Sequence, residues 1–194
     1  MSPLVYFVRH GQTIWNAEKR FQGQADTDMT ERGRSQADRN GRRLAELIDR
    51  PEDFDFVASP LRRTRETMER IRIAMGLPPE GYRTDPRLIE VHFGDWQGLT
   101  FAELEARHPG STKVRALDKW RFVPPGLGES YQMLLERVQP WFEKLERPTV
   151  CVTHGGVIRA MFRLVEAMPS DEAAALEVVQ DRVLRFQDGK LTWL

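Results

Sequence analysis

Two histidines in this sequence follow short apolar runs and precede glycines. His10 follows the run 4–8 and Arg9, and His154 follows the run 149–152 and Thr153. A neutral imidazole keeps one ring nitrogen with a free lone pair, which can act as a nucleophile. Taken alone, His10 is better explained as a loop histidine hydrogen-bonded to backbone. The repetition of the two histidines after two strand-like runs makes them candidates for one site.

Charged residues near these histidines suit an anionic substrate. Arg9 directly precedes His10, and Arg62 lies near the start of a predicted helix, where free N–H groups favour phosphate. A guanidinium can bind two phosphate oxygens at once. We therefore expect Arg62 to bind the anion and the other arginines of this helix to face solvent. Glu90 lies between apolar neighbours and is a candidate general acid, because partial burial favours the protonated form, although a salt-bridged glutamate would look the same.

The composition narrows the class of protein. Lysine plus arginine equals aspartate plus glutamate at 29 each, so no global field favours nucleic acid or a membrane as partner, and a small anion needs a local basic cluster. The single Cys151 excludes an internal disulfide and fits a reducing compartment. No run resembles a signal peptide or a membrane span. We expect a cytoplasmic protein.

The four histidines lack metal-ligand spacing and no glycine-rich nucleotide loop occurs, so we expect neither metal nor cofactor.

Hydrophobic periodicity predicts strands alternating with helices. We expect strands at 4–8, 54–58 and 149–152 and a hairpin at 183–193. We expect helices at 30–48, 59–75, 100–107 and 129–145, and one more after His154. Ser59 is expected to cap the second helix, with Pro60 in its first turn. This alternation predicts one α/β domain, residues 1–194, with a mainly parallel sheet. Ligands gather at the carboxyl ends of such strands, where both histidines fall. The outer strand of this hairpin would be a sheet edge that can pair with a second copy of the chain, so a homodimer is one alternative.

Four blocks in register resemble the histidine phosphatase superfamily, also called phosphoglycerate mutase-like. They are Arg-His-Gly-x-Thr-x-x-Asn from Arg9 to Asn16 with its continuation Arg-Phe-Gln-Gly to Gly23, the Ser-Pro-Leu-x-Arg-type block at Ser59, the Leu-x-Glu-x-x-Phe-Gly-x-Trp-x-Gly block from Leu88 to Gly98, and the late Thr-His-Gly-Gly.

The resemblance implies a fold and a set of roles. The fold would be a three-layer α/β/α sandwich. His10 would become a phosphohistidine, Arg9, Arg62 and His154 would surround the phosphoryl group, and Glu90 would act as acid and then base. No metal would be needed, because arginines and imidazole supply the positive charge. Asn16, Gln22, Gly23 and the Gly155 backbone would assist binding.

The same resemblance leaves three functions open. The segment between Glu90 and His154 is shorter than in the mutases and lacks their basic insertion, and the stretch from Pro124 to Ser130 resembles the phosphatases. A phosphatase of a small phosphorylated metabolite is therefore favoured over a cofactor-dependent phosphoglycerate mutase. A non-catalytic receptor for phosphorylated ligands is the third reading, disfavoured because every expected catalytic residue is present.

Overall fold

A computed structural model describes residues 3–194 of the chain. Its centre is a six-stranded sheet in the order β3-β2-β4-β1-β5-β6. The strands are β1 Val5–Arg9, β2 Asp55–Ala58, β3 Arg83–Thr84, β4 Thr149–Thr153, β5 Val183–Gln187 and β6 Lys190–Trp193. β3, β2, β4 and β1 pair in parallel, whereas β5 pairs antiparallel with β1 and with β6. The sheet is therefore mixed, with a parallel part that holds both histidine-bearing strands.

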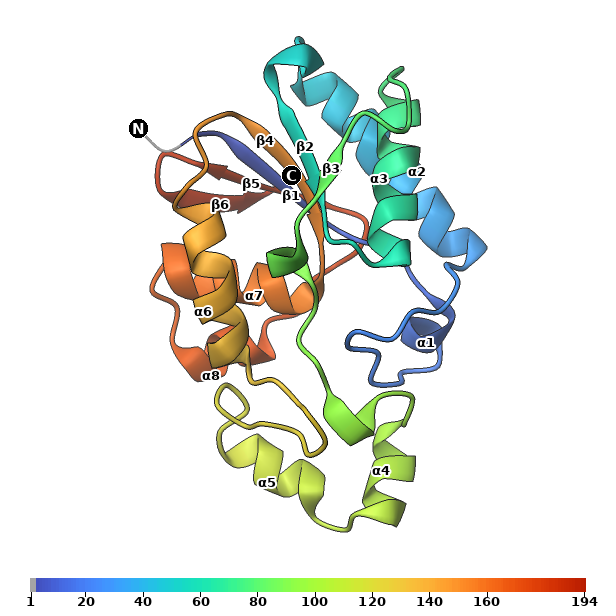
Figure 1. Ribbon diagram of the computed structural model, residues 1–194, viewed down its shortest axis with the longest axis vertical. Coiled ribbons are helices and arrows are strands. Elements are labelled where there is room, and N and C mark those ends of the chain that lie inside the picture. The colour runs from blue at the N-terminus through green and yellow to red at the C-terminus, as the bar shows by residue number, and fades with distance from the viewer. Residues whose placement is uncertain (1–2) are drawn as a thin grey trace.

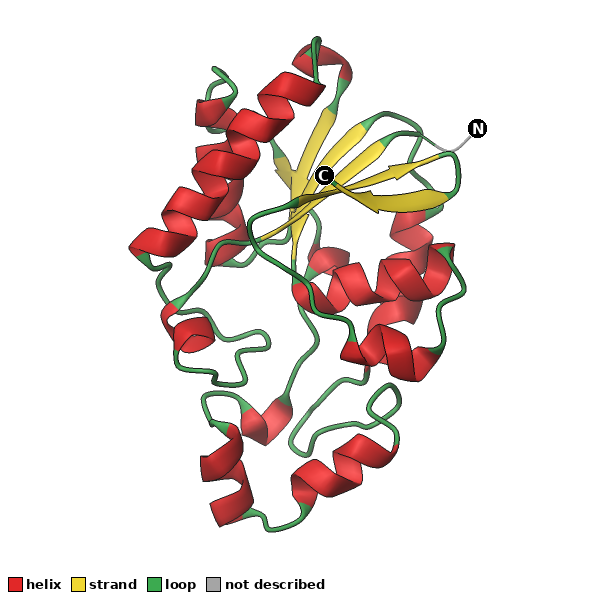
Figure 2. Cartoon of the chain, turned by 180° about the vertical axis from the view of Figure 1, so that it is seen from behind, coloured by secondary structure: helices red, strands yellow, loops and turns green. Residues whose placement is uncertain are grey.

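Helices cover both faces of the sheet (Figures 1 and 2), which confirms the three-layer α/β/α architecture. They are α1 Ile14–Ala17, α2 Glu31–Leu47, α3 Arg62–Ala74, α4 Phe101–Arg107, α5 Ser111–Leu117, α6 Tyr131–Phe142, α7 Gly155–Val165 and α8 Ser170–Ala175, with short 3-10 turns η1 Pro51–Asp53, η2 Pro86–Leu88 and η3 Gly94–Trp96. Among residues 3–194 no helix combines the length and apolarity needed to cross a bilayer.

Strand alternation explains how one sheet supplies two cores. Val5 and Phe7 of β1 pack under α6 and α7, whereas Tyr6 and Val8 pack under α2 and α3. Successive side chains of a strand point to opposite faces, so a strand buried on both sides reads as a continuous apolar run. The all-buried β4 follows the same rule, and its Cys151 belongs to the first core. Burial raises the pKa of the Cys151 thiol, which fits a core residue rather than a nucleophile.

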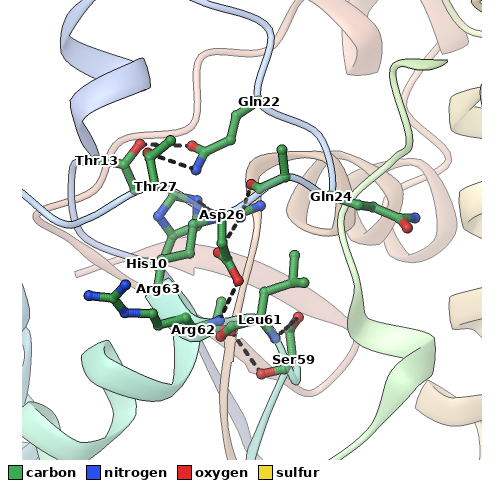
Figure 3. Close-up of polar contacts among 12 residues, drawn as sticks. His10, Thr13, Gln22, Gln24, Asp26, Thr27, Ser59, Leu61, Arg62 and Arg63 are labelled. Carbon is green, nitrogen blue, oxygen red and sulfur yellow. Dashed lines mark hydrogen bonds and ion pairs between the residues drawn. The ribbon is translucent and has the colours of Figure 1, made fainter. Parts of the chain in front are cut away.

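Local signals place most of the predicted helices. Thr30 caps α2 by accepting a hydrogen bond from Gly33 N, and Thr100 forms a capping box with Glu103 at α4. The predicted start of the second helix is wrong. α3 begins at Arg62 with Leu61 as its N-cap, while the Ser59 hydroxyl accepts a bond from Leu61 N, as Figure 3 shows.

A smaller lobe lies beyond the carboxyl ends of the parallel strands (Figure 1). It is built from η3, α4, α5 and the loops between them, and has its own core of Phe21, Trp96, Leu99 and Leu104. Because Phe21 comes from the loop after α1, this core ties the lobe to the segment that follows His10. The lobe thereby forms one wall of the space in front of the sheet.

Candidate active site

Strand register brings the two histidines together. β1 and β4 are parallel neighbours in which Arg9 pairs with Thr153, so the next residues, His10 and His154, leave the sheet side by side. His10 N donates to Thr153 O at 3.0 Å, and the two imidazole centroids are 5.2 Å apart. The predicted meeting of the two histidines is therefore confirmed in position.

His10 is held in a single tautomer. Its Nδ1 lies 2.8 Å from Gly11 O, and because a carbonyl oxygen can only accept, Nδ1 carries the proton. Nε2 accepts a hydrogen bond from Arg63 Nε at 3.2 Å. Burial and then the Arg63 and Arg9 charges hold the pKa of His10 well below its ordinary value. At neutral pH the ring is uncharged, with its lone pair on Nε2.

His154 is neutral for the same reasons. Burial and the nearby Arg63 charge lower its pKa. Its Nδ1 accepts from Arg63 Nη2 at 3.3 Å, so Nε2 carries the proton and donates to Ser59 Oγ at 2.8 Å. The side chain is fully buried and does not line the cleft. In this structure His154 therefore positions Arg63. The place beside the phosphoryl group that the resemblance implies for His154 stays a prediction.

Arg63, and not Arg62, is the arginine of α3 that reaches the site. The Arg62 side chain is 64% exposed and ion-pairs with Asp28 at 2.7 Å, while its backbone N–H donates to Asp26 Oδ2 at 2.8 Å (Figure 3). Arg63 is 1% exposed and ion-pairs with Asp26 at 2.9 Å. The prediction of Arg62 is thus wrong by one position, because the first position on the buried face of α3 is Arg63.

All the donors of Arg63 are engaged. Besides the two histidines and Asp26, its guanidinium donates to the carbonyls of Gly23 and Ala25 at 2.6 and 2.8 Å. These bonds fix the plane of the guanidinium beside His10 Nε2. Gly23 has φ +56°, and a side chain there would collide with Gln97 Oε1. This explains the glycine in the Arg-Phe-Gln-Gly block.

Arg9 supplies a second guanidinium with an unused donor. Its Nη1 donates to Val178 O, while its Nε is buried and, within residues 3–194, has no hydrogen-bond partner. Burial and the neighbouring Arg159 charge lower the pKa of Arg9 to about 10, so it remains a cation at neutral pH. A buried N–H without a partner is costly, and an oxyanion in front of His10 would satisfy it.

Glu90 lies on the same cleft, held by backbone donors. Both carboxylate oxygens accept from Gly156 N at 3.1 Å, and Oε1 also accepts from Val91 N at 2.9 Å. Gly156 is the second residue of α7, so its N–H has no intrahelical partner and is free to donate to Glu90. A Cβ on Gly156 would lie 2.2 Å from Glu90 Oε1. The second glycine of Thr-His-Gly-Gly is therefore required by the approach of Glu90.

The predicted binding residues line this cleft, whose volume is about 570 Å³; they are Asn16, Gln22, Gly23 and Gly155, with Arg9, His10 and Glu90. Gln22 acts mainly inside the wall, because its Oε1 accepts from Thr13 Oγ1 at 2.7 Å (Figure 3) and from Asn16 Nδ2. Its side chain thus orients Asn16.

Other lining residues lie beyond the reach of sequence patterns. Gln180 donates to the His10 carbonyl and to Asn16 Oδ1, both at 3.0 Å, although it lies 170 residues from His10 along the chain. Arg115, Lys119, Tyr131 and Arg159 also face the cleft. No motif marks these positions, and only the assembled fold brings them to the site.

The family model of the histidine phosphatase superfamily (branch 1) matches residues 5–193. This chain belongs to the histidine phosphatase superfamily. It is a histidine phosphatase-type phosphomonoesterase, as predicted, and the family assignment agrees with the neutral His10 in its basic cleft.

Relatives of this histidine phosphatase include both phosphatases and mutase-like proteins. It is 36% identical to the glucosyl-3-phosphoglycerate phosphatase of Mycolicibacterium vanbaalenii, over 84% of this chain and 74% of the relative. It is 35% identical to phosphoglycerate mutase-like protein 4 of Arabidopsis thaliana, over 95% of this chain and 80% of that relative. A solved mycobacterial glucosyl-3-phosphoglycerate phosphatase with VO3 superposes with a TM-score of 0.80 at 32% identity, covering 100% of this chain and 96% of that one.

Proposed function

We propose that this enzyme hydrolyses a small phosphomonoester through a covalent phosphohistidine at His10. The observation that carries the proposal is the neutral His10 ring, whose Nε2 lone pair faces the fixed guanidinium of Arg63. Phosphoryl transfer depends mostly on positioning and on neutralising charge on the phosphoryl oxygens. The unpaired Nε of Arg9 offers a donor to the phosphoryl oxygens, and the Arg63 cation beside His10 Nε2 adds positive charge.

The reaction proceeds in two displacements. The phosphoryl group displaces the hydrogen bond that Arg63 Nε donates to His10 Nε2. The freed Nε2 lone pair attacks phosphorus, the bond from phosphorus to the leaving oxygen breaks, and that oxygen takes the proton of the protonated Glu90 carboxyl group. Water then attacks the phosphohistidine, Glu90 accepts a water proton, and the N–P bond breaks to release phosphate. The site thus returns to its starting state without consuming a cofactor.

The substrate is proposed from the relatives. Two relatives are named glucosyl-3-phosphoglycerate phosphatase, so glucosyl-3-phosphoglycerate is the first natural substrate to assay. A second candidate function is phosphoglycerate mutase, favoured by relatives such as the bisphosphoglycerate-dependent mutase of Gloeobacter violaceus, 33% identical over 90% of this chain. Conversion of 2- to 3-phosphoglycerate, primed with bisphosphoglycerate, would identify a mutase. We also propose that the enzyme acts in the cytoplasm on a small molecule, as its single buried cysteine and lack of net charge suggest.

The test of the proposed function is hydrolysis of p-nitrophenyl phosphate in excess EDTA, followed by acid–base trapping of the phosphoenzyme. We expect turnover to survive EDTA and the trapped phosphoryl group to be stable in base and labile in acid, as a phosphoramidate is. Activity that disappears in EDTA and returns with a divalent metal would contradict the proposal, as would an acid-stable phosphoenzyme.

Replacing Glu90 by glutamine is expected to slow hydrolysis of glycerol phosphate by about 10²-fold or more, and of p-nitrophenyl phosphate much less. A poor leaving group needs the proton that Glu90 gives, whereas p-nitrophenolate leaves without it. The glutamine carbonyl can still accept from Val91 and Gly156 N, so the loop is kept. Comparing kcat for both substrates checks this, with exposed Glu46→Gln as the matched control. Equal losses on both substrates would remove Glu90 from the acid role.

A further inference from the structure

The cleft carries more positive charge than one phosphate needs. Among residues 3–194, seven lysines and arginines line it and Glu90 is the one carboxylate that does, although the whole chain has no net charge. A phosphomonoester brings a charge of about −2, which Arg9 and Arg63 can neutralise. Basic residues farther from His10 are left over.

The surplus is concentrated in three side chains, Arg115, Lys119 and Arg159. Within residues 3–194 no ion pair involves any of them, whereas the nearby Arg20 pairs with Glu18 and Glu103. Burial and repulsion from Arg115 and Arg159 lower the pKa of Lys119 to about 8. The three cations are therefore close together and unneutralised.

Aromatic rings and a backbone carbonyl hold this cluster in place. The Arg115 guanidinium lies over Phe21 and Phe93, at 5.8 and 6.0 Å from the ring centroids. Arg159 lies 5.8 Å from the centroid of Tyr131, and its Nε donates to Leu176 O at 3.0 Å. These contacts fix the side chains without neutralising them.

The cluster adjoins the phosphoryl position. A Cβ built on Gly155 would lie 3.2 Å from Arg159 Nη1 and 3.6 Å from Arg9 Nε, so Arg159 spans the space between the two groups of cations. Arg115 belongs to α5 and Lys119 follows it. The segment between Glu90 and His154, although short, thus brings two basic side chains to the cleft.

We propose that Arg115, Lys119 and Arg159 form a second anion subsite, so that the natural substrate carries a carboxylate or second phosphate besides the phosphoryl group that is transferred. The inference deepens the proposed function and rests on it for the position of that phosphoryl group. Guanidinium groups suit both anions, because their parallel N–H donors match two oxygens. The subsite selects phosphorylated acids over neutral phosphorylated alcohols.

Binding to a His10→Ala background tests the subsite without turnover. We expect 3-phosphoglycerate to bind at least about tenfold more tightly than glycerol 3-phosphate by titration calorimetry, because the two differ in one carboxylate. Adding Lys119→Gln is expected to reduce this preference to about threefold or less. Adding Lys113→Gln, an exposed lysine of α5 that does not line the cleft, should leave the preference intact. Comparing fructose 1,6-bisphosphate with fructose 6-phosphate shows whether a second phosphate gains more than a carboxylate.

Two outcomes would overturn the subsite: equal affinity for the compounds of both pairs, or a preference that survives Lys119→Gln in full. Neither touches the proposed function, which fails only if the natural enzyme does not hydrolyse p-nitrophenyl phosphate in EDTA or forms no phosphohistidine. Lys119 carries the test because it is only half-buried, so its replacement leaves the packing of Arg115 on Phe21 and Phe93 in place.

Discussion

His10→Ala is expected to lower kcat for p-nitrophenyl phosphate by about 10⁴-fold or more, because the attacking atom itself is removed. The structure gives no substitute at the same point. The other buried imidazole, His154, does not line the cleft, whereas His10 does. Steady-state kinetics at neutral pH measures the loss, and the same variant should trap no phosphoenzyme.

Exposed His108→Ala is the matched control for this loss, since His108 follows α4 and does not line the cleft. It should retain activity to within about twofold, as expected for a surface substitution. Circular dichroism and thermal unfolding establish that both variants fold. A His10→Ala protein that keeps a tenth or more of the natural rate would show that the nucleophile is another residue. The proposed mechanism would then be contradicted, although the chain would still belong to the family.

The meeting of His10 and His154 could be predicted from sequence, because it depends only on strand order and strand ends. Each histidine directly follows a buried strand, and parallel strands end at the same edge of a sheet. The register of β1 on β4 then aligns Arg9 with Thr153. Glu90 followed from its apolar surroundings and from the family block. These predictions needed no knowledge of side-chain direction.

Residues brought in by long-range packing could not be predicted in this way. Gln180 lies in a loop before β5, and Arg115 and Lys119 belong to a lobe whose helix α5 was not predicted. Their side chains reach the cleft because the core of Phe21, Trp96, Leu99 and Leu104 docks that lobe against the loop after His10. Nothing in the local pattern of residues 111–119 marks a binding surface.

The error at Arg62 concerns helix phase, and the sequence contained the information to avoid it. Residues three to four apart share a helix face. Arg63 is four residues before Thr67 and eight before Ile71, both fully buried on α3. Arg62 has no such relation to the buried stripe. Proximity to the helix start misled the prediction, whereas the phase of the stripe selects Arg63.

Arg63→Ala is therefore expected to lower kcat/KM by about 10³-fold, as loss of a charge-stabilising donor does, whereas Arg62→Ala should change it by about twofold or less. Arg63 contacts His10, whereas the Arg62–Asp28 pair is exposed. Arg63→Lys should recover little activity, because an ammonium cannot bridge His10, His154 and Asp26 with one rigid plane. Measuring kcat/KM of the three variants on p-nitrophenyl phosphate shows whether Arg63 or Arg62 serves the active site.

Stability must be separated from catalysis in this comparison, because Arg63 also joins the carbonyls of Gly23 and Ala25 to α3. Arg63→Lys keeps the charge inside the site, so a folded, inactive lysine variant would assign the loss to the guanidinium geometry itself. An Arg62→Ala variant as impaired as Arg63→Ala would mean that the exposed arginine turns inward when substrate binds. In that case the phosphoryl group would be held from the Asp28 side of the cleft.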